Sequence, residues 1–435
     1  YGCVYTRTTG IWQTVWLEPV PRTYLQRPRV TPNLADGTLH ITQPIGGNRA
    51  GLTLRARLLD EHGVVAAAAA PADRDFMPQL VLAIPAERLR LWSPADPFLY
   101  NLEIELCDTV GVVCDAIASY AGMRSVTLDG MAVKINGTTV FQRLVLDQGY
   151  YPDGILTAPT DDALRRDIEL SMAAGFNGAR LHQKVFEERF LYHADRLGYL
   201  VWAEFADWIS FGTDMFNRPV YHATIITQWL EALHRDYSHP CIIGWCPLNE
   251  SHDGFPGTIT PLDDATRGMF LATKAMDQTR PVLDSSGYSH RVPEADIYDS
   301  HDYDQRPDAV RERHAGLAAG TPYVNLERGQ PMSVPYRGQP YFVSEFGGIW
   351  WNPEAAADTP SWGYGERPKT IEEFYTRFEG LCHVLLENPA MFGYCYTQLT
   401  DVFQEQNGLY FFDRRPKFVV ARLRAIQTRA AAIEQ

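Results

Sequence analysis

An alternation of short apolar runs with longer helical stretches, which starts near residue 126, constrains the fold of this chain most strongly. In the stretch 162–174, for example, Leu164, Ile168 and Met172 recur at a spacing of four, which is typical of one face of a helix. We interpret as buried strands the apolar runs 140–147, 176–182, 199–205, 241–249, 281–286, 297–302, 341–346 and 392–398. The helical stretches are 162–174, 186–197, 224–237, 264–278, 371–386 and 417–433. Eight buried strands that alternate with helices over roughly 300 residues predict a (β/α)8 TIM barrel.

The first part of the chain, up to about residue 122, has a different pattern. Short runs with apolar alternation, at 38–45, 52–58 and 99–107, are separated by Gly, Pro, Asn and Asp, as in a sandwich of short strands. The alanine run 66–70 precedes Pro71 and Asp73, and we interpret it as the edge of a loop. The sequence therefore predicts a β-sandwich followed by a barrel.

The composition excludes several classes of protein. Hydrophobic residues make up 45% of the chain and charged residues 21%, which is typical of a globular protein and not of a disordered or fibrous one. The net charge of −14 disfavours a nucleic acid or an anionic membrane as a partner. No apolar run reaches the roughly 18 residues that a membrane-spanning helix needs, so we predict no membrane contact.

The seven cysteines contain neither a CxxC pair nor a paired zinc spacing, and we expect reduced thiols. Cys107 and Cys114 could face each other across a hairpin, so a single disulfide stays open. The start of the chain lacks the basic and then apolar pattern of a signal peptide. A cytoplasmic location is expected ahead of secretion, but a processed chain would have lost such a segment, and the location stays open.

Polar side chains follow seven of the eight predicted strands, at the ends where barrels carry their active sites. They are Asp147, Gln148, Arg180, His182, Glu204, Asn249, Glu250, His301, Tyr303, Glu345 and Gln398, with Asp207 and Trp208 shortly after the third strand. A polar group at one strand end is usually a cap, whereas groups at seven ends indicate a shared site. The tryptophans on which sugar rings could stack are Trp208, Trp245, Trp350 and Trp351.

Two carboxyl groups that face each other across such a site suit the hydrolysis of an acetal. One protonates the departing oxygen, and the other attacks the anomeric carbon or activates a water molecule. Glu250 and Glu345 are the best pair, because each directly ends an apolar run of strand character. The alternative for these two residues is a salt bridge at the rim of the barrel.

A series of motifs runs through nearly the whole chain: TGIWQTVWLE at 9–18, LWSP at 91–94, PFLY at 97–100, GMR at 122–124, ING at 135–137, FNGAR at 176–180 and HPCII at 239–243. Together with Asn249-Glu250 and with SEFG at 344–347, this ordered series resembles glycoside hydrolase family 2, the family of β-galactosidases, β-glucuronidases and β-mannosidases. Each motif alone is weak, and the series is strong.

The resemblance implies three parts of the chain. Residues 20–122 correspond to an immunoglobulin-like β-sandwich and residues 123–435 to the (β/α)8 catalytic barrel. Residues 1–19 correspond to the last strands of an N-terminal sugar-binding sandwich. Because the chain starts without a methionine, we expect the rest of that sandwich to be missing from this sequence. Ile11, Trp12, Val15 and Trp16 should then be exposed or packed against a neighbouring element.

The resemblance also implies a retaining exo-β-glycosidase, with Glu250 as acid/base, Glu345 as nucleophile and carboxyl groups about 5–5.5 Å apart. Asn249 would contact the sugar 2-hydroxyl, Tyr303 would bond the nucleophile, and Arg180 would be buried near it. We expect a neighbouring cation to keep Glu345 ionised and an apolar wall to keep Glu250 protonated. The other predicted substrate-binding residues are Asp147, His182, His301, Glu204, Trp208, Gln398 and Asp401.

Some positions depart from the family pattern. The second strand ends in His182-Gln183-Lys184, where many members carry a Ser-His-Tyr-type stretch, so His182 could be either a sugar contact or a structural histidine. Glucuronidases hold the sugar carboxylate with an Asn-x-Lys motif, but residues 407–409 read NGL, which disfavours a glucuronide unless Arg414 or Arg415 substitutes. The metal-binding pattern of the large β-galactosidases is not recognisable, and we predict no essential metal and no cofactor.

Residues after the eighth strand and the choice of sugar leave further alternatives. Asp401, Gln404 and Glu405 are either partners of sugar hydroxyls or part of a solvated loop. The expected order of substrates is β-galactoside, then β-glucoside or mannoside, then glucuronide or galacturonide, and a homo-oligomer is possible. A metal-dependent amidohydrolase would need a His-x-His motif early in the barrel, and none is present. A carbohydrate-binding protein without catalysis stays open, because most of the sugar-binding sandwich is missing.

Overall fold

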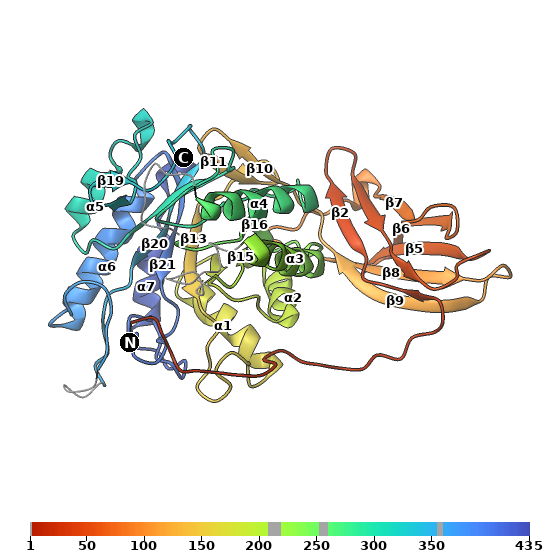
Figure 1. Ribbon diagram of the computed structural model, residues 1–435, viewed down its shortest axis with the longest axis horizontal. Helices are drawn as coiled ribbons and strands as arrows, with labels where there is room; N and C mark the ends of the chain where they lie inside the picture. The colour runs from red at the N-terminus through yellow and green to blue at the C-terminus, as the bar shows by residue number, and fades with distance from the viewer. Residues whose placement is uncertain (1, 208–218, 252–259, 355–359) are drawn as a thin grey trace.

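The buried apolar side chains form two separate clusters, one for each architecture that the sequence predicts. The computed structural model describes residues 2–207, 219–251, 260–354 and 360–435. Figure 1 shows a β-sandwich at one end of the molecule and a barrel of parallel strands, covered by helices, at the other. The predicted fold class, a β-sandwich followed by a TIM barrel, is confirmed.

The sandwich consists of a three-stranded and a four-stranded antiparallel sheet. The strands of the first sheet are β2 (Arg29–Asn33), β3 (Thr38–Thr42) and β7 (Gln79–Ala83). Those of the second are β5 (Thr53–Asp60), β6 (Gly63–Pro71), β8 (Tyr100–Cys107) and β9 (Val113–Ala121), while β1 (Tyr24–Leu25) pairs with β4 (Ile45–Gly46). Along β5, Leu54, Ala56 and Leu58 are buried and the residues between them face outward, as the period of a strand requires.

Two local expectations differ from the structure here. The alanine run 66–70 lies within strand β6, where each alanine pairs with a residue of β5, and the prediction of a loop edge was wrong. Alanine has a low strand propensity, but the ladder to β5 outweighs it. All seven cysteines are free thiols, and Val113 rather than Cys114 lies opposite Cys107.

One seven-stranded parallel sheet forms the barrel wall, in the order β16-β15-β14-β13-β21-β20-β17. The strands are β13 (Gln142–Asp147), β14 (Gly178–Leu181), β15 (Leu200–Glu204), β16 (Ile242–Cys246), β17 (Tyr298–Asp302), β20 (Tyr341–Gly347) and β21 (Met391–Thr397). The predicted fifth strand, 281–286, is present only as isolated bridges from Val282 to Trp245 and from Ser286 to Asn249. It therefore continues the wall beside β16 without forming a full ladder.

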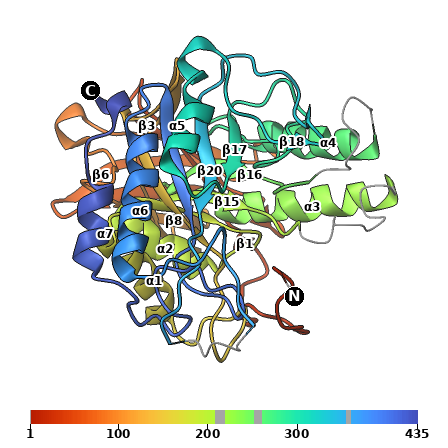
Figure 2. The ribbon, with the colours of Figure 1, turned by 90° about the vertical axis from the view of Figure 1, so that its left-hand side faces the viewer.

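The helices lie outside this sheet and return the chain from each strand to the next (Figures 1 and 2). They are α1 (Asp161–Ala173), α2 (Glu188–Leu197), α3 (Pro219–Asp236), α4 (Pro261–Met276), α5 (Pro307–His314), α6 (Ile371–Leu386) and α7 (Val420–Gln427). Thr160 caps the start of helix α1, because its side chain accepts a hydrogen bond from the amide of Ala163. Helix α5 was not predicted, and α7 is shorter than the predicted stretch 417–433. No helix within the described residues is long and apolar enough to cross a membrane.

Short elements join the sandwich to the barrel. A small sheet of β10 (Val126–Asp129), β11 (Ala132–Ile135) and β12 (Thr138–Thr139) follows the sandwich. A separate hairpin in the barrel, beyond β17, pairs β18 (Leu326–Glu327) with β19 (Gln330–Pro331). At the interface, Tyr120 of β9 donates to Asp195 of α2 over 2.8 Å. The guanidinium of Arg124 donates to the carbonyl oxygens of Pro240 and Ile242.

The N-terminal segment, residues 2–23, contains no helix or strand and runs from the sandwich along the barrel (Figure 1). Ile11, Val15 and Trp16 are exposed. Trp12 is half-buried, and its ring lies 5.2 Å from the ammonium of Lys184. Gly2 accepts hydrogen bonds from the side chains of Trp362 and Gln404, so this segment reaches the loops at the mouth of the barrel.

Candidate active site

A buried arginine organises the carboxyl ends of the barrel strands. Arg180, near the end of β14, has a fully buried side chain. It donates to Glu204 of β15 over 2.6 Å, to Glu345 of β20 over 3.1 Å and to Asn249 after β16 over 3.1 Å. Two carboxylates therefore compensate one buried cation, which a guanidinium can do because its donors point in several directions.

Glu345 accepts hydrogen bonds from two side chains and has a histidine nearby. Oε1 lies 3.1 Å from Arg180, and Oε2 accepts from the hydroxyl of Tyr303 over 2.5 Å. His182 Nδ1 lies 3.9 Å from Oε1. Burial by itself would raise the pKa of Glu345, but the charges of His301, Arg180 and His182 outweigh it and hold the pKa well below its usual range. The expected cation beside Glu345 is therefore present, and Glu345 is ionised at neutral pH.

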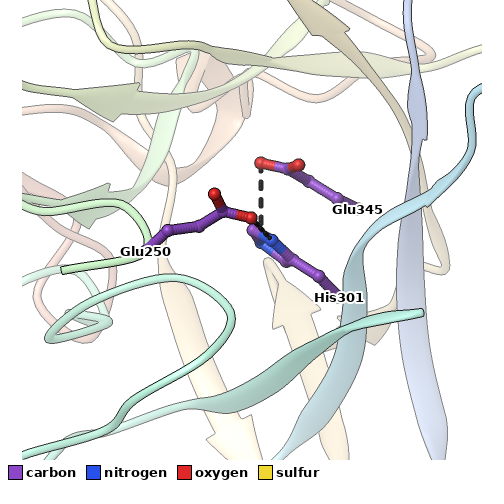
Figure 3. A group of neighbouring side chains, drawn as sticks. All are labelled: Glu250, His301 and Glu345. Carbon is purple, nitrogen blue, oxygen red and sulfur yellow. Dashed lines mark hydrogen bonds and ion pairs between the residues drawn. The ribbon is translucent and has the colours of Figure 1, made fainter. Parts of the chain in front are cut away.

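Glu250 faces the imidazole of His301, and the apolar wall that we expected beside Glu250 stays a prediction. Its Oε1 lies 2.5 Å from Nδ1 of His301, and Nε2 of the same ring lies 3.5 Å from Oε1 of Glu345 (Figure 3). The Glu250 side chain is 13% exposed, whereas that of His301 is fully buried. One oxygen of each carboxyl group and one ring nitrogen all lie within 4.8 Å of one another. The two glutamates thus meet across His301.

Asn249 is held by groups from three neighbouring segments of the barrel. Its Oδ1 accepts from Arg180 over 3.1 Å and from the hydroxyl of Ser286 over 2.5 Å. Its backbone amide donates to Asp207 over 2.6 Å, and Asp207 also accepts from the hydroxyl of Ser251. The sequence places Asp207 shortly after the third strand, but no substrate-binding or catalytic role was predicted for it. It positions the segment that carries Asn249 and Glu250.

Tyr303 connects the nucleophile candidate to the eighth strand. Besides Glu345, its hydroxyl lies 3.0 Å from that of Thr397. Its ring stacks on Tyr364 with centroids 3.4 Å apart. Tyr364 was missed, because it lies in a long loop between β20 and α6 with no periodic signal in the sequence. This stack fixes the orientation of the Tyr303 hydroxyl.

Five side chains from distant parts of the chain close a ring of hydrogen bonds beside this site. Gln148 donates to Gln398 and to the Tyr5 hydroxyl, each over 2.8 Å, and Tyr5 donates to Glu405. Asn407 donates to Glu405 over 3.0 Å and accepts from Gln398 over 2.9 Å. We call these five residues the polar ring. Glu405 is buried in it and does not belong to a solvated loop.

Several predicted site residues lie elsewhere. Asp147 does not join the polar ring, although its neighbour Gln148 does. The carboxyl group of Asp147 accepts a hydrogen bond from the amide of Gly149. Burial and the charge of Asp167 raise the pKa of Asp147 to about 7. Asp401 forms a buried ion pair with Lys417 over 2.5 Å. Trp245 is buried in the core and donates to Asp277, so no sugar can stack on it. Asp147 and Gln148 are directed differently because successive side chains along an extended chain point to opposite sides.

The remaining predicted residues divide as follows. Glu204 accepts a hydrogen bond from Arg180 and lies 3.3 Å from Nδ1 of His182. Glu204 and His182 are therefore part of the buried charge network around Arg180. Trp350 and Trp351 are half-buried beyond the end of β20. Trp208 lies outside the described residues. Arg414 pairs with Asp167 and Arg415 with Glu354 and Asp413, so both guanidinium groups are already engaged.

A metal ion could also bind at this site. Within the described residues, three possible ligands lie close together here: Glu250, His301 and Glu345. An imidazole nitrogen and two carboxylate oxygens are common ligands of transition metals. These are the same oxygen atoms that acid/base and nucleophilic chemistry would use. A metal ion bound there would compete with the reaction of an acetal.

Comparisons with known proteins agree with both architectures. The family model described as glycosyl hydrolases family 2 matches residues 23–124, and the model of the TIM barrel domain of that family matches residues 157–331. The chain is 29% identical to a β-galactosidase of Aeromonas hydrophila over 311 residues, which are 67% of this chain and 29% of that protein. It is 27% identical to a β-glucuronidase of Paenibacillus borealis over 243 residues, 53% of this chain and 38% of that protein.

Solved structures share the fold. The crystal structure of a β-glucuronidase of Ruminococcus gnavus matches with a TM-score of 0.74 at 18% identity and covers 94% of this chain and 68% of that one. The structure of a β-glucuronidase of Dictyoglomus thermophilum matches with a TM-score of 0.72 at 19% identity and covers 95% and 70%. The chain thus spans about two thirds of these structures, but only 29% and 38% of the two curated relatives.

Proposed function

The chain belongs to glycoside hydrolase family 2, and on this premise we propose that it is a retaining exo-β-glycosidase with Glu345 as nucleophile and Glu250 as acid/base. The observation that carries the proposal is the approach of one oxygen of each carboxyl group to within 4.8 Å of the other. Retaining enzymes have carboxyl groups about 5–5.5 Å apart, whereas inverting enzymes leave about 6.5–9.5 Å for a water molecule.

In the first step, Glu345 attacks the anomeric carbon while Glu250 protonates the departing oxygen. Glu345 is suited to attack because it is ionised and because Arg180 and Tyr303 fix both of its oxygens. A covalent glycosyl-enzyme results, and the leaving group departs as an alcohol.

In the second step, the Glu250 carboxylate takes a proton from water, which attacks the same carbon and releases Glu345. Two inversions give net retention of configuration. Asn249 lies between Arg180 and Ser286 beside the two glutamates, and we propose that it contacts the sugar 2-hydroxyl in both steps.

A neutral terminal β-linked sugar is the proposed substrate, with a β-galactoside first. The β-galactosidase of Aeromonas hydrophila supports this order. A glucuronide ranks last, because Arg414, Arg415 and Lys417 are all paired with carboxylates and because Glu405 adds a further carboxyl group to the polar ring.

The test is a panel of p-nitrophenyl β-glycosides with wild type, Glu345→Gln and Glu250→Ala. We expect Glu345→Gln to lose at least about 10³-fold in kcat/KM, because no other group can form the covalent bond. Glu250→Ala should regain turnover with azide and give a β-glycosyl azide. A 2-deoxy-2-fluoro glycoside should label Glu345, which mass spectrometry of the peptides detects.

The matched control is Glu312→Gln, which removes an exposed carboxyl group of α5. It should leave kcat/KM unchanged. If no glycoside is turned over while sugars still bind, the chain is a carbohydrate-binding protein and the proposed function is wrong. Turnover by Glu345→Gln at the rate of wild type would remove Glu345 from its proposed role.

A further inference from the structure

His301 is fixed between the two glutamates by groups on both sides of its ring. Its backbone exchanges two hydrogen bonds with the side chain of Asn325, over 3.1 and 2.8 Å. A Cβ atom on Gly287 would lie 2.5–2.6 Å from three atoms of the imidazole, so only glycine at this position leaves room for the ring. The ring therefore has little freedom to turn away from Glu250 and Glu345.

The register of the barrel sheet also sets this position. The pairing of β17 with β20 shifts between Ser300 and His301, which places His301 directly opposite Glu345. Such irregularities re-aim a side chain and are frequent next to active sites. The imidazole is thus directed at the glutamates by backbone geometry.

Among the residues that the structure describes, few charged and titratable groups face the ring. Glu250 lies on one side and Glu345 on the other, Arg180 lies behind Glu345, and the rings of Tyr288 and Tyr303 are 5.6 and 6.4 Å away. Burial would lower the pKa of His301, but the charge of Glu345 and the hydrogen bond to Glu250 outweigh burial and raise the pKa above its usual value.

Nδ1 of His301 and Oε1 of Glu250 lie 2.5 Å apart, and at this distance a single proton must lie between the two atoms. Two protons would clash, and two facing lone pairs would repel each other. The other ring nitrogen, Nε2, then carries the remaining N–H and directs it at Glu345, which stays ionised. The pair of Glu250 and His301 therefore contains the proton that an acid catalyst needs.

On the basis of the proposed function, we propose that His301 is a positioning residue that holds the catalytic proton of Glu250 in the resting enzyme. When a substrate binds, the proton moves from Nδ1 to the Glu250 carboxylate and then to the glycosidic oxygen, as the electron pair of the C–O bond passes to that oxygen. Glu345 forms the new bond to the anomeric carbon. In the second step, Glu250 takes a proton from water, and the shared contact with Nδ1 is restored.

The first experiment compares leaving groups in His301→Asn. Against a methyl or phenyl glycoside, whose leaving group needs acid catalysis, kcat/KM should fall about 10²-fold, whereas the 2,4-dinitrophenyl glycoside should lose less than about tenfold. The basic limb of the pH profile should move to lower pH by at least about one unit, because no imidazole shares the proton any longer. Equal losses for both leaving groups with an unmoved basic limb would overturn the proposal.

His182→Asn is the matched control, since it removes another buried imidazole that lies 3.9 Å from Glu345. Its loss should be the same for both leaving groups, because acid catalysis stays intact. A leaving-group dependence as large as that of His301→Asn would show that any buried imidazole has this effect, and the special role of His301 would be wrong.

A second measurement does not depend on turnover. In protein labelled with ¹⁵N-histidine, the His301 resonances, assigned by their absence in His301→Asn, should titrate above the usual range of histidine in wild type and at lower pH in Glu250→Gln. If His301 titrates identically in both, the pair does not share a proton. Should wild type hydrolyse no glycoside while this titration is as expected, the proposed function fails and the proton-sharing pair stands.

Discussion

At the scale of the residue, the site depends on a single buried cation that serves two carboxylates. Arg180 bonds Glu204 and Glu345, and it also donates to the backbone carbonyl of Ser344 over 2.6 Å. Burial would raise the pKa of Glu204, but the charge of Arg180 lowers it below its usual range. Removing either partner of such a network leaves an uncompensated buried charge, which typically costs about 3–5 kcal/mol. Conservative variants around Arg180 are therefore the informative ones.

Tyr303→Phe keeps the stack on Tyr364 but removes the hydroxyl that donates to Glu345. That hydrogen bond favours the ionised carboxylate, so its loss raises the pKa of Glu345. We expect the acidic limb of kcat/KM to move to higher pH and kcat to fall about tenfold. The pH profiles of kcat and of kcat/KM measure both effects, and Tyr192→Phe, which removes a hydroxyl of α2 that lies 3.4 Å from Arg196, is the control. An acidic limb that stays in place would contradict the assignment of that limb to Glu345.

Glu405→Gln tests the buried carboxyl group of the polar ring. Burial raises the pKa of Glu405 to about 7. The folded protein therefore holds this proton more tightly than the unfolded chain, and the stability that this provides is lost as the pH rises through 7. Glutamine cannot ionise, so relative to wild type the variant should gain up to about 3 kcal/mol between pH 5 and pH 8.

Unfolding by urea at both pH values measures this difference in free energy. Glu312→Gln, in an exposed position on α5, should track wild type at both. A difference between Glu405→Gln and wild type that is the same at pH 5 and pH 8 would mean that Glu405 does not titrate in this range.

At the scale of elements, irregular pairing of the barrel strands sets the direction of the candidate catalytic side chains. The ladder from β17 to β20 shifts at His301, and the ladder from β20 to β21 shifts between Val343 and Phe346, around Glu345. Both irregularities occur where the candidate chemistry is placed. A regular ladder would alternate side chains strictly between the barrel interior and the helices.

The contact of strand β9 with helix α2 couples the sandwich to the barrel. Tyr120 donates to Asp195 over 2.8 Å, and His239 lies 2.6 Å from the same oxygen. Tyr120→Phe should cost about 1–2 kcal/mol of stability, since a half-buried donor to a carboxylate is removed. Urea unfolding measures the cost. Tyr192→Phe should cost much less, because within the described residues the Tyr192 hydroxyl has a single long contact of 3.4 Å, with Arg196. Equal costs would refute the coupling.

At the scale of the whole molecule, the N-terminal segment takes part in the candidate site. Tyr5 belongs to the polar ring although Glu405 lies 400 residues further along the chain. Gln13 donates to the carbonyl of Val185, which anchors the middle of the segment to the barrel. That residues 1–19 end a larger sugar-binding sandwich stays a prediction, as does a homo-oligomer.

Tyr5→Ala should raise KM about tenfold, because the polar ring loses one of its two donors to Glu405 and opens on one side. The fold should be intact, since this segment contributes no strand or helix. Steady-state kinetics with the best glycoside of the panel measures the change. Val4→Ala, at a position that is 74% exposed, is the control. Identical kinetics of the two variants would show that the segment has no influence on the site.

The sequence by itself determined the order of the architectures, the main strands and helices of the barrel, and the placement of Glu250, Glu345, Arg180 and Tyr303 at strand ends. These features are local, because the period of apolar residues follows directly from which face is buried. Only the tertiary structure decided that Gln148 and not Asp147 joins the site, that Trp245 is in the core, that residues 66–70 form a strand, and that Tyr5 meets Glu405. The reason is that side-chain direction at a strand end depends on register and irregularities in the ladder, and these are set by pairing with segments far away in the chain.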